Sequence, residues 1–184
     1  MKKKIAAFVL LLLVMALIPA VIVCREIPRP KAENGASADN NKPEIVALAA
    51  SMCSDDFCDE AVRAMVILAN TDYQSVEPVN NNSDKEIINL ASLYYDSNKE
   101  LYIQKNGKKY TIPYSVLSNG STAADVDYPY LYPSASPWDC LDSGFDENSS
   151  CVGVSLRGVD YLCKHGFSAE QALLHYLSGF EICA

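Results

Sequence analysis

A long apolar run near the N-terminus constrains this chain more than any other feature of its sequence. Ile5 to Cys24 form 20 consecutive positions without a charge, directly after the cluster Lys2–Lys4. A helix of that length spans about 30 Å, the thickness of the hydrocarbon core of a bilayer. Lysines that flank such a helix favour the cytoplasmic side. We therefore expect residues 1–24 to be a single-pass anchor in the cell membrane, with the C-terminal part outside the cytoplasm.

A cleaved signal peptide is the competing interpretation of the same run. Signal peptides usually have a shorter apolar core and end in small residues before the cleavage site. This run ends instead in Val21, Ile22 and Val23 before Cys24. The same bulky residues differ from the glycine or alanine that precedes the lipidated cysteine of a lipoprotein. The length and the flanking residues therefore favour an uncleaved anchor.

The chain beyond the anchor divides into a linker and one domain. Residues 25–43 contain Pro28, Pro30 and Pro43 and almost no large apolar side chain, which is typical of a flexible linker. Residues 44–184 are long enough to bury one core. Because three of the 15 basic side chains precede the apolar run and all 23 acidic ones follow it, the rest of the chain has a formal charge of −11. That charge argues against nucleic acid and anionic lipid as partners.

Hydrophobic periodicity predicts a single small α+β domain with a small antiparallel sheet and about four to five helices. The segments with helical spacing are Ile45 to Met52, Asp59 to Asp72, Lys85 to Tyr95, the end of Val152 to Lys164, and Ser168 to Leu177. Glu100 to Ser115 alternates apolar and polar residues on both sides of Asn106-Gly107, which predicts a β-hairpin. Ser168 and Gln171 have the spacing of a capping box.

An even number of cysteines lies in the domain that we expect to be exported. They are Cys53, Cys58, Cys140, Cys151, Cys163 and Cys183. Exported cysteines are usually oxidised, so the count predicts three disulfides among about 15 possible pairings. Order along the chain suggests Cys53–Cys58, Cys140–Cys151 and Cys163–Cys183. A zinc site is the weaker interpretation, since no histidine lies beside these cysteines, and we expect neither a metal nor a cofactor.

Three blocks of the domain share motifs with a known family. The first joins Ala50-Ser51-Met52 to the helix that begins with Glu60-Ala61-Val62. The second contains Tyr128-Pro129-Tyr130-Leu131 and Ser136-Pro137-Trp138-Asp139, and the third runs from Val152-Gly153-Val154-Ser155 to His175-Tyr176 and Gly179. In this order the blocks resemble the stage II sporulation protein D family, which consists of membrane-anchored peptidoglycan lytic transglycosylases. The resemblance implies peptidoglycan glycan strands as the ligand. It also implies a cell-wall amidase and a membrane scaffold protein as partners in sporulation.

The positions of the family's active site carry other residues here. Ser51 stands where the family has its catalytic glutamate, and Asn70, Ser115 and Ser150 replace an arginine and two histidines. A lytic transglycosylase must protonate the glycosidic oxygen and then accept the proton of the sugar's 6-hydroxyl group near neutral pH. A serine hydroxyl can do neither. The sequence therefore predicts a catalytically inactive relative, a pseudoenzyme that binds glycan or partner proteins.

An active enzyme with a relocated acid is the alternative. Asp55, Asp56, Asp59 and Glu60 follow Ser51 closely. However, the N-terminus of a helix stabilises the charged form of a carboxylate, which does not suit a general acid. We therefore interpret these four residues as helix N-terminal charges.

Aromatic side chains supply the candidate glycan contacts. Tyr128, Tyr130 and Trp138 lie within the second block, and aromatic rings can cover the apolar face of a sugar. The other interpretation is that these residues pack at the edge of a sheet.

Overall fold

The structure is a computed structural model that describes residues 42–72 and 84–184. The anchor predicted for residues 1–24, and nearly all of the linker predicted for residues 25–43, lie outside the described residues. Within the two described ranges, no helix is long and apolar enough to cross a membrane.

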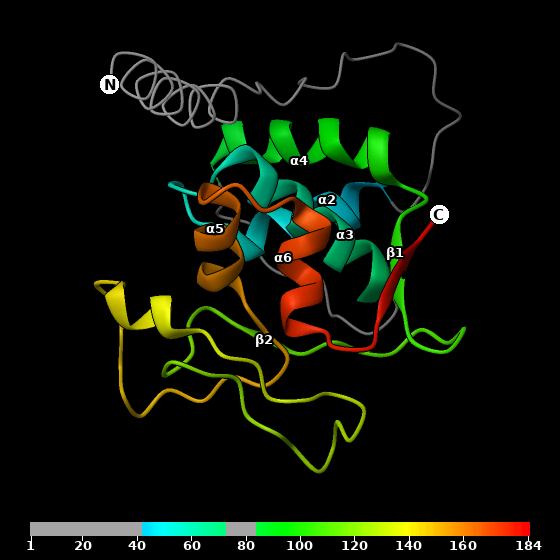
Figure 1. The fold of residues 1–184 in the computed structure, drawn as a ribbon. Helices are drawn as coiled ribbons and strands as arrows, with labels where there is room; N and C mark the ends of the chain where they lie inside the picture. Colours follow the sequence, from blue (N-terminus) through cyan, green and yellow to red (C-terminus); the bar gives the residue numbers. More distant parts are fainter. Residues whose placement is uncertain (1–41, 73–83) are drawn as a thin grey trace, which may run out of the picture. The chain divides into compact units, whose positions relative to one another are not determined.

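The described residues form a mixed α+β domain, as the sequence predicts (Figure 1). They contain five α-helices, one short 3-10 helix and two small sheets of two strands each. In chain order the elements are α2 (Lys42–Met52), α3 (Asp59–Asp72), α4 (Lys85–Asn98), β1 (Tyr102–Gln104), β2 (Tyr114–Ser115), η2 (Pro137–Leu141), β3 (Val154–Ser155), α5 (Leu156–Lys164), α6 (Ala169–Tyr176) and β4 (Glu181–Cys183).

Helix α3 is the centre of the core. Its apolar residues Ala61, Val62 and Ala64–Ala69 are all 0% exposed, so they surround the helix rather than forming one stripe. A helix that is apolar on every side needs neighbours on every side. The helices α2, α4, α5 and α6 and the strand β1 supply them (Figure 1).

The ends of three helices follow from local sequence signals. The side chain of Asp84 accepts a hydrogen bond from the backbone N–H of Glu86 at the start of α4. At the start of α6, Ser168 and Gln171 form the predicted capping box. Gly166, at φ 92°, follows the end of α5, and its N–H donates to the carbonyl of Cys163 (3.0 Å).

The predicted hairpin over Glu100 to Ser115 is wrong in its strand pairing. The Asn106-Gly107 turn is present, but only Lys105 and Lys108 pair across it. Strand β1 pairs instead with β4 in antiparallel register, and β2 pairs with β3 in parallel register.

Two contacts explain this difference. The return segment from the turn packs Tyr110 against Tyr130, with 4.4 Å between ring centroids. Farther along the same segment, Pro113 has no N–H to donate to a ladder, and its carbonyl accepts a hydrogen bond from Val154 N–H (3.1 Å). The return segment therefore leaves β1 and joins β3, and the C-terminal β4 takes its place.

Shortening a buried leucine side chain of α3 to alanine should reduce the stability of the domain far more than the same change at an exposed leucine. Leu68 is 0% exposed and Leu141 is 77% exposed. We expect Leu68→Ala to lower the free energy of unfolding by about 2–5 kcal/mol, because it leaves a cavity in the core. Leu141→Ala should change it by no more than about 0.5 kcal/mol. Urea denaturation followed by circular dichroism measures both, and equal effects of the two variants would contradict the central position of α3.

Candidate functional site

A buried carboxylate joins the segments that surround the candidate site. Asp139 in η2 is 1% exposed. Its Oδ2 accepts hydrogen bonds from the N–H (2.9 Å) and the hydroxyl (2.6 Å) of Ser118, and from the hydroxyl of Ser155 (2.6 Å). Ser155 is also the N-cap of α5, since its Oγ accepts a hydrogen bond from Gly158 N–H (3.2 Å). One carboxylate therefore ties the loop at Ser118, the helix η2 and the start of α5 together.

Next to this carboxylate, the hydroxyl of Tyr176 joins η2 to α6. It lies 2.7 Å from the hydroxyl of Ser136 and accepts a hydrogen bond from Trp138 Nε1 (3.2 Å). Burial raises the pKa of Tyr176 above its usual range, so the hydroxyl stays protonated. A Cβ atom at Gly158 would lie 1.9 Å from this hydroxyl. Only glycine at this position lets α5 come so close to α6.

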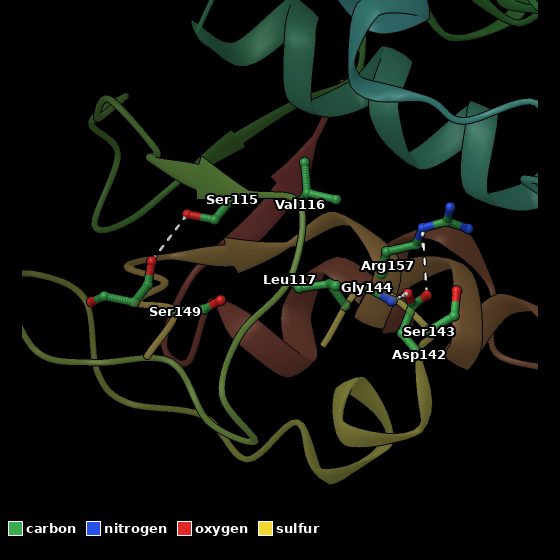
Figure 2. Close-up of a pocket in the computed structure, with 9 residues that line it drawn as sticks. Ser115, Val116, Leu117, Asp142, Ser143, Gly144, Ser149 and Arg157 are labelled. Atoms are coloured by element: carbon green, nitrogen blue, oxygen red, sulfur yellow. Dashed lines mark hydrogen bonds and ion pairs between the residues drawn. The ribbon is translucent and has the colours of Figure 1, made fainter. Parts of the chain in front are cut away.

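A pocket of about 530 Å³ opens beside these segments (Figure 2). We call it the first pocket, and it is lined by Ser115, Val116, Leu117, Asp142, Ser143, Gly144, Ser149, Ser150 and Arg157. Figure 2 shows Ser115 and Ser149 toward one end of it and Arg157 with Asp142 toward the other.

A second pocket of about 270 Å³ shares Asp142 and Arg157 with the first. Its other lining residues are Asp56, Trp138, Asp139, Leu141, Asp160, Tyr161 and Lys164. Because two residues line both pockets, the pockets are neighbours, and Arg157 lies between them.

Ion pairs hold the charged side chains of the pockets. Arg157 Nη1 donates to both carboxylate oxygens of Asp56 at 2.7 Å, and its Nε lies 3.6 Å from Asp142 Oδ2. Lys164 Nζ lies 2.6 Å from Asp160 Oδ2. The hydrogen bond from Arg157 lowers the pKa of Asp56, so this carboxyl group is charged near neutral pH and has no proton to give.

The structure brings together two of the four residues that the resemblance aligns with active-site positions. Ser115 Oγ donates to the carbonyl of Ser150 (3.5 Å), and both line the first pocket. Ser51 lies elsewhere, near the end of α2, where its hydroxyl donates to the carbonyl of Leu48 (2.7 Å). Asn70 donates to the carbonyl of Leu101 (2.6 Å) near the end of α3. Ser51 and Asn70 line neither pocket.

The three aromatic residues predicted to contact glycan fall into two clusters. The ring of Tyr130 lies 4.4 Å from that of Tyr110 and 6.1 Å from that of Tyr128 between centroids. Trp138 belongs to another cluster, in which it stacks parallel to Tyr161 at 5.5 Å. Of the three, only Trp138 lines one of the two pockets described above.

Sequence reasoning missed Arg157 and Tyr161 as pocket residues. Both lie on α5, four positions apart, which places them on the same face of the helix. The sequence signal that could have identified them as pocket residues is their position shortly after the Val152-Gly153-Val154-Ser155 block. The resemblance sets Leu156 or Arg157 in the place of a glutamine of the family's site, but it gives no role to Tyr161.

Glu60 has a structural role in the fold. It is 5% exposed, and its Oε1 accepts hydrogen bonds from Arg63 (2.8 Å) and from the N–H of Ala169 (2.7 Å) at the start of α6. Arg63 also forms an ion pair with Glu170. These contacts hold α3 against α6 and agree with the interpretation of Glu60 as a helix N-terminal charge.

The six cysteines of the domain are free thiols in the structure. The disulfides expected from their order along the chain therefore stay predictions. Within the described residues, no group of three or more His, Cys, Asp or Glu side chains is arranged to hold a metal ion.

A scan of protein-family models found none that matches the chain, and a search of curated proteins found no match. The resemblance to the stage II sporulation protein D family is thus a hypothesis. The functional argument depends on the residues of the two pockets.

Removing the carboxylate of Asp139 should destabilise the domain strongly. Asp139→Ala leaves the buried N–H and hydroxyl of Ser118 and the hydroxyl of Ser155 without this acceptor. We expect a loss of about 3–5 kcal/mol in the free energy of unfolding, since each unsatisfied buried group costs about 1–3 kcal/mol.

Asp96→Ala is the matched control, because Asp96 pairs with Lys42 at the surface. It should cost no more than about 1 kcal/mol. Thermal and urea denaturation measure both variants. A loss at Asp139 as small as that at Asp96 would show that the carboxylate does not hold these segments together.

Proposed function

We propose that this domain is a catalytically inactive glycan-binding module of a membrane-anchored, cell-wall-associated protein, similar to stage II sporulation protein D. One observation carries the proposal. Ser115 and Ser150, which replace the family's two histidines, lie far apart in the sequence and line one pocket. A chain that kept the fold of the family but lost its catalytic side chains would bring the replacing residues together in one pocket in this way. The anchor at residues 1–24, the amidase and the membrane scaffold partner belong to the same proposal.

The chemistry of the first pocket suits a sugar chain. Its four serine hydroxyls can donate to and accept from sugar hydroxyl and acetamido groups, and Arg157 supplies a planar, charged donor. Exposed apolar side chains stand beside these polar groups, with Val116 59% exposed in the first pocket and Leu141 77% exposed in the second. A few polar groups among apolar contacts are typical of small-molecule sites.

The carboxylates of the pockets do not suit acid catalysis. Asp56, Asp142 and Asp160 are each paired with Arg157 or Lys164. Asp139 accepts three hydrogen bonds through one oxygen. A general acid of a lytic transglycosylase has to keep its proton until the glycosidic bond breaks. The hydrogen bond from Arg157 lowers the pKa of Asp56, and ion pairs engage Asp142 and Asp160. These contacts support binding of glycan without cleavage.

Removing the Arg157 guanidinium should weaken binding to glycan. Full-length protein in detergent micelles is mixed with purified peptidoglycan sacculi, and the bound fraction is measured after sedimentation. We expect Arg157→Met to raise the apparent Kd about tenfold or more, because a hydrogen bond to a charged group contributes about 1.5–3 kcal/mol.

Lys42→Met is the matched control, because Lys42 also pairs with both oxygens of a surface aspartate, Asp96. It should bind as the wild type does. Sacculi stripped of stem peptides by an amidase should still sediment the protein, since the proposed ligand is the glycan strand. Loss of sedimentation with stripped sacculi, or equal effects of the two variants, would contradict the proposal.

The same samples test the alternative of an active enzyme. Chromatography of the soluble fraction detects anhydro-muropeptides, and the proposal predicts none. Anhydro products that disappear in Asp55→Asn or Asp56→Asn would show that a relocated acid cleaves glycan.

A further inference from the structure

Two cysteines that are distant in the sequence meet where α3 and α5 pack together. Cys58 precedes α3, and its carbonyl accepts hydrogen bonds from the N–H groups of Ala61 (2.9 Å) and Val62 (3.1 Å). Cys163 lies in the last turn of α5. Asp160, three positions before Cys163 on α5, accepts a hydrogen bond from Cys58 N–H (2.9 Å). Residues three apart share a helix face, so Asp160 holds the backbone of Cys58 against the face that carries Cys163.

The two thiols are within hydrogen-bonding reach of each other. Cys163 is 8% exposed and packs in the core, and Cys58 is partly buried at the edge of the same cluster. The hydrogen bond from Cys163 lowers the pKa of the Cys58 thiol. The same bond and burial raise the pKa of Cys163. Cys58 is therefore both the more accessible sulfur and the one that ionises first.

We propose that Cys58 and Cys163 form a disulfide that links the start of α3 to the end of α5. This pairing replaces the Cys53–Cys58 and Cys163–Cys183 bridges suggested by order along the chain. It goes beyond the proposed function, because it does not depend on glycan binding.

The bond forms by thiol–disulfide exchange with a disulfide-bearing oxidant, either a protein or a small molecule. The Cys58 thiolate attacks one sulfur of the oxidant's disulfide, which makes a mixed disulfide and releases one oxidant thiolate. Cys163 then loses its proton and attacks the Cys58 sulfur, and the second oxidant thiolate leaves. The two protein thiols lose two electrons and two protons, and the oxidant becomes a pair of thiols.

A third cysteine, Cys53, lies five positions before Cys58 in the sequence but is a poor competitor for the disulfide. Its Sγ donates to the carbonyl of Ala49 (3.2 Å). Burial raises the pKa of the Cys53 thiol to about 12, so little thiolate is present for exchange.

The proposed disulfide would also fix one wall of the second pocket. The segment from Cys53 to Cys58 carries Asp56, and α5 carries Arg157, the partner of Asp56. A covalent link at the end of that segment would hold the Asp56–Arg157 ion pair in place.

Mass spectrometry of the full-length protein tests the pairing. The reduced protein in detergent is incubated with excess oxidised glutathione, blocked with an alkylating reagent and digested without reductant. We expect a peptide pair that joins Cys58 to Cys163. Peptides that join Cys53 to Cys58 or Cys163 to Cys183, or alkylated Cys58 and Cys163 after oxidation, would overturn the proposal. This measurement on the wild type needs no variant to fold.

Thermal unfolding supplies a second readout. Oxidation should raise the unfolding midpoint of the wild type by about 5–15 °C, because the link closes a long loop in the unfolded chain, and dithiothreitol should reverse the shift. Cys58→Ser and Cys163→Ser should each abolish it. Cys53→Ser is the matched control and should keep it. If the shift in the unfolding midpoint persists in Cys163→Ser but is lost in Cys53→Ser, the disulfide involves Cys53 and not Cys163. That result would contradict the proposal.

Discussion

The hydrogen bonds to Asp139 are the interaction on which the rest of the candidate site depends. A carboxylate that is 1% exposed has lost nearly all its water, so it is stable only with protein donors. Ser118 and Ser155 supply those donors from two different segments. Because Ser155 also caps α5, the same bonds set where α5 begins, and Arg157 lies only two positions farther on. The carboxylate thus positions the charged group shared by both pockets.

The pockets contain polar and apolar side chains that can contact a ligand, together with charged side chains that already form ion pairs with each other. Serine hydroxyls and exposed apolar side chains are available in the first pocket. The cations and carboxylates around Arg157 are paired with one another. Such a site offers hydrogen bonds and contact area to a ligand. This arrangement supports the proposed binding of glycan without cleavage. Ser51 lies away from both pockets.

Local signals in the sequence predicted the elements well, and contacts between distant segments were harder to predict. The bounds of α3 and the capping box of α6 were correct because they depend on residues within one or two turns. The predicted strand pairing was wrong because β1 pairs with the C-terminal β4. No local pattern near Tyr102 indicates that partner. At the site, Ser115 and Ser150 were named only through the resemblance, and their meeting in one pocket needed the fold. The ion pair between Asp56 and Arg157 joins the turn before α3 to helix α5. It depends on tertiary packing, which hydrophobic periodicity cannot predict.

The most direct test of the account is to find where glycan contacts the domain. Amide resonances of the isotope-labelled full-length protein in detergent can be followed by NMR while a soluble, uncrosslinked glycan strand is added. The account predicts that the largest shifts fall on the amides of Ser115, Ser143, Gly144, Ser150 and Arg157, and that the glycan stays intact. Shifts confined to Tyr110, Tyr128 and Tyr130, or cleavage of the added strand, would contradict it.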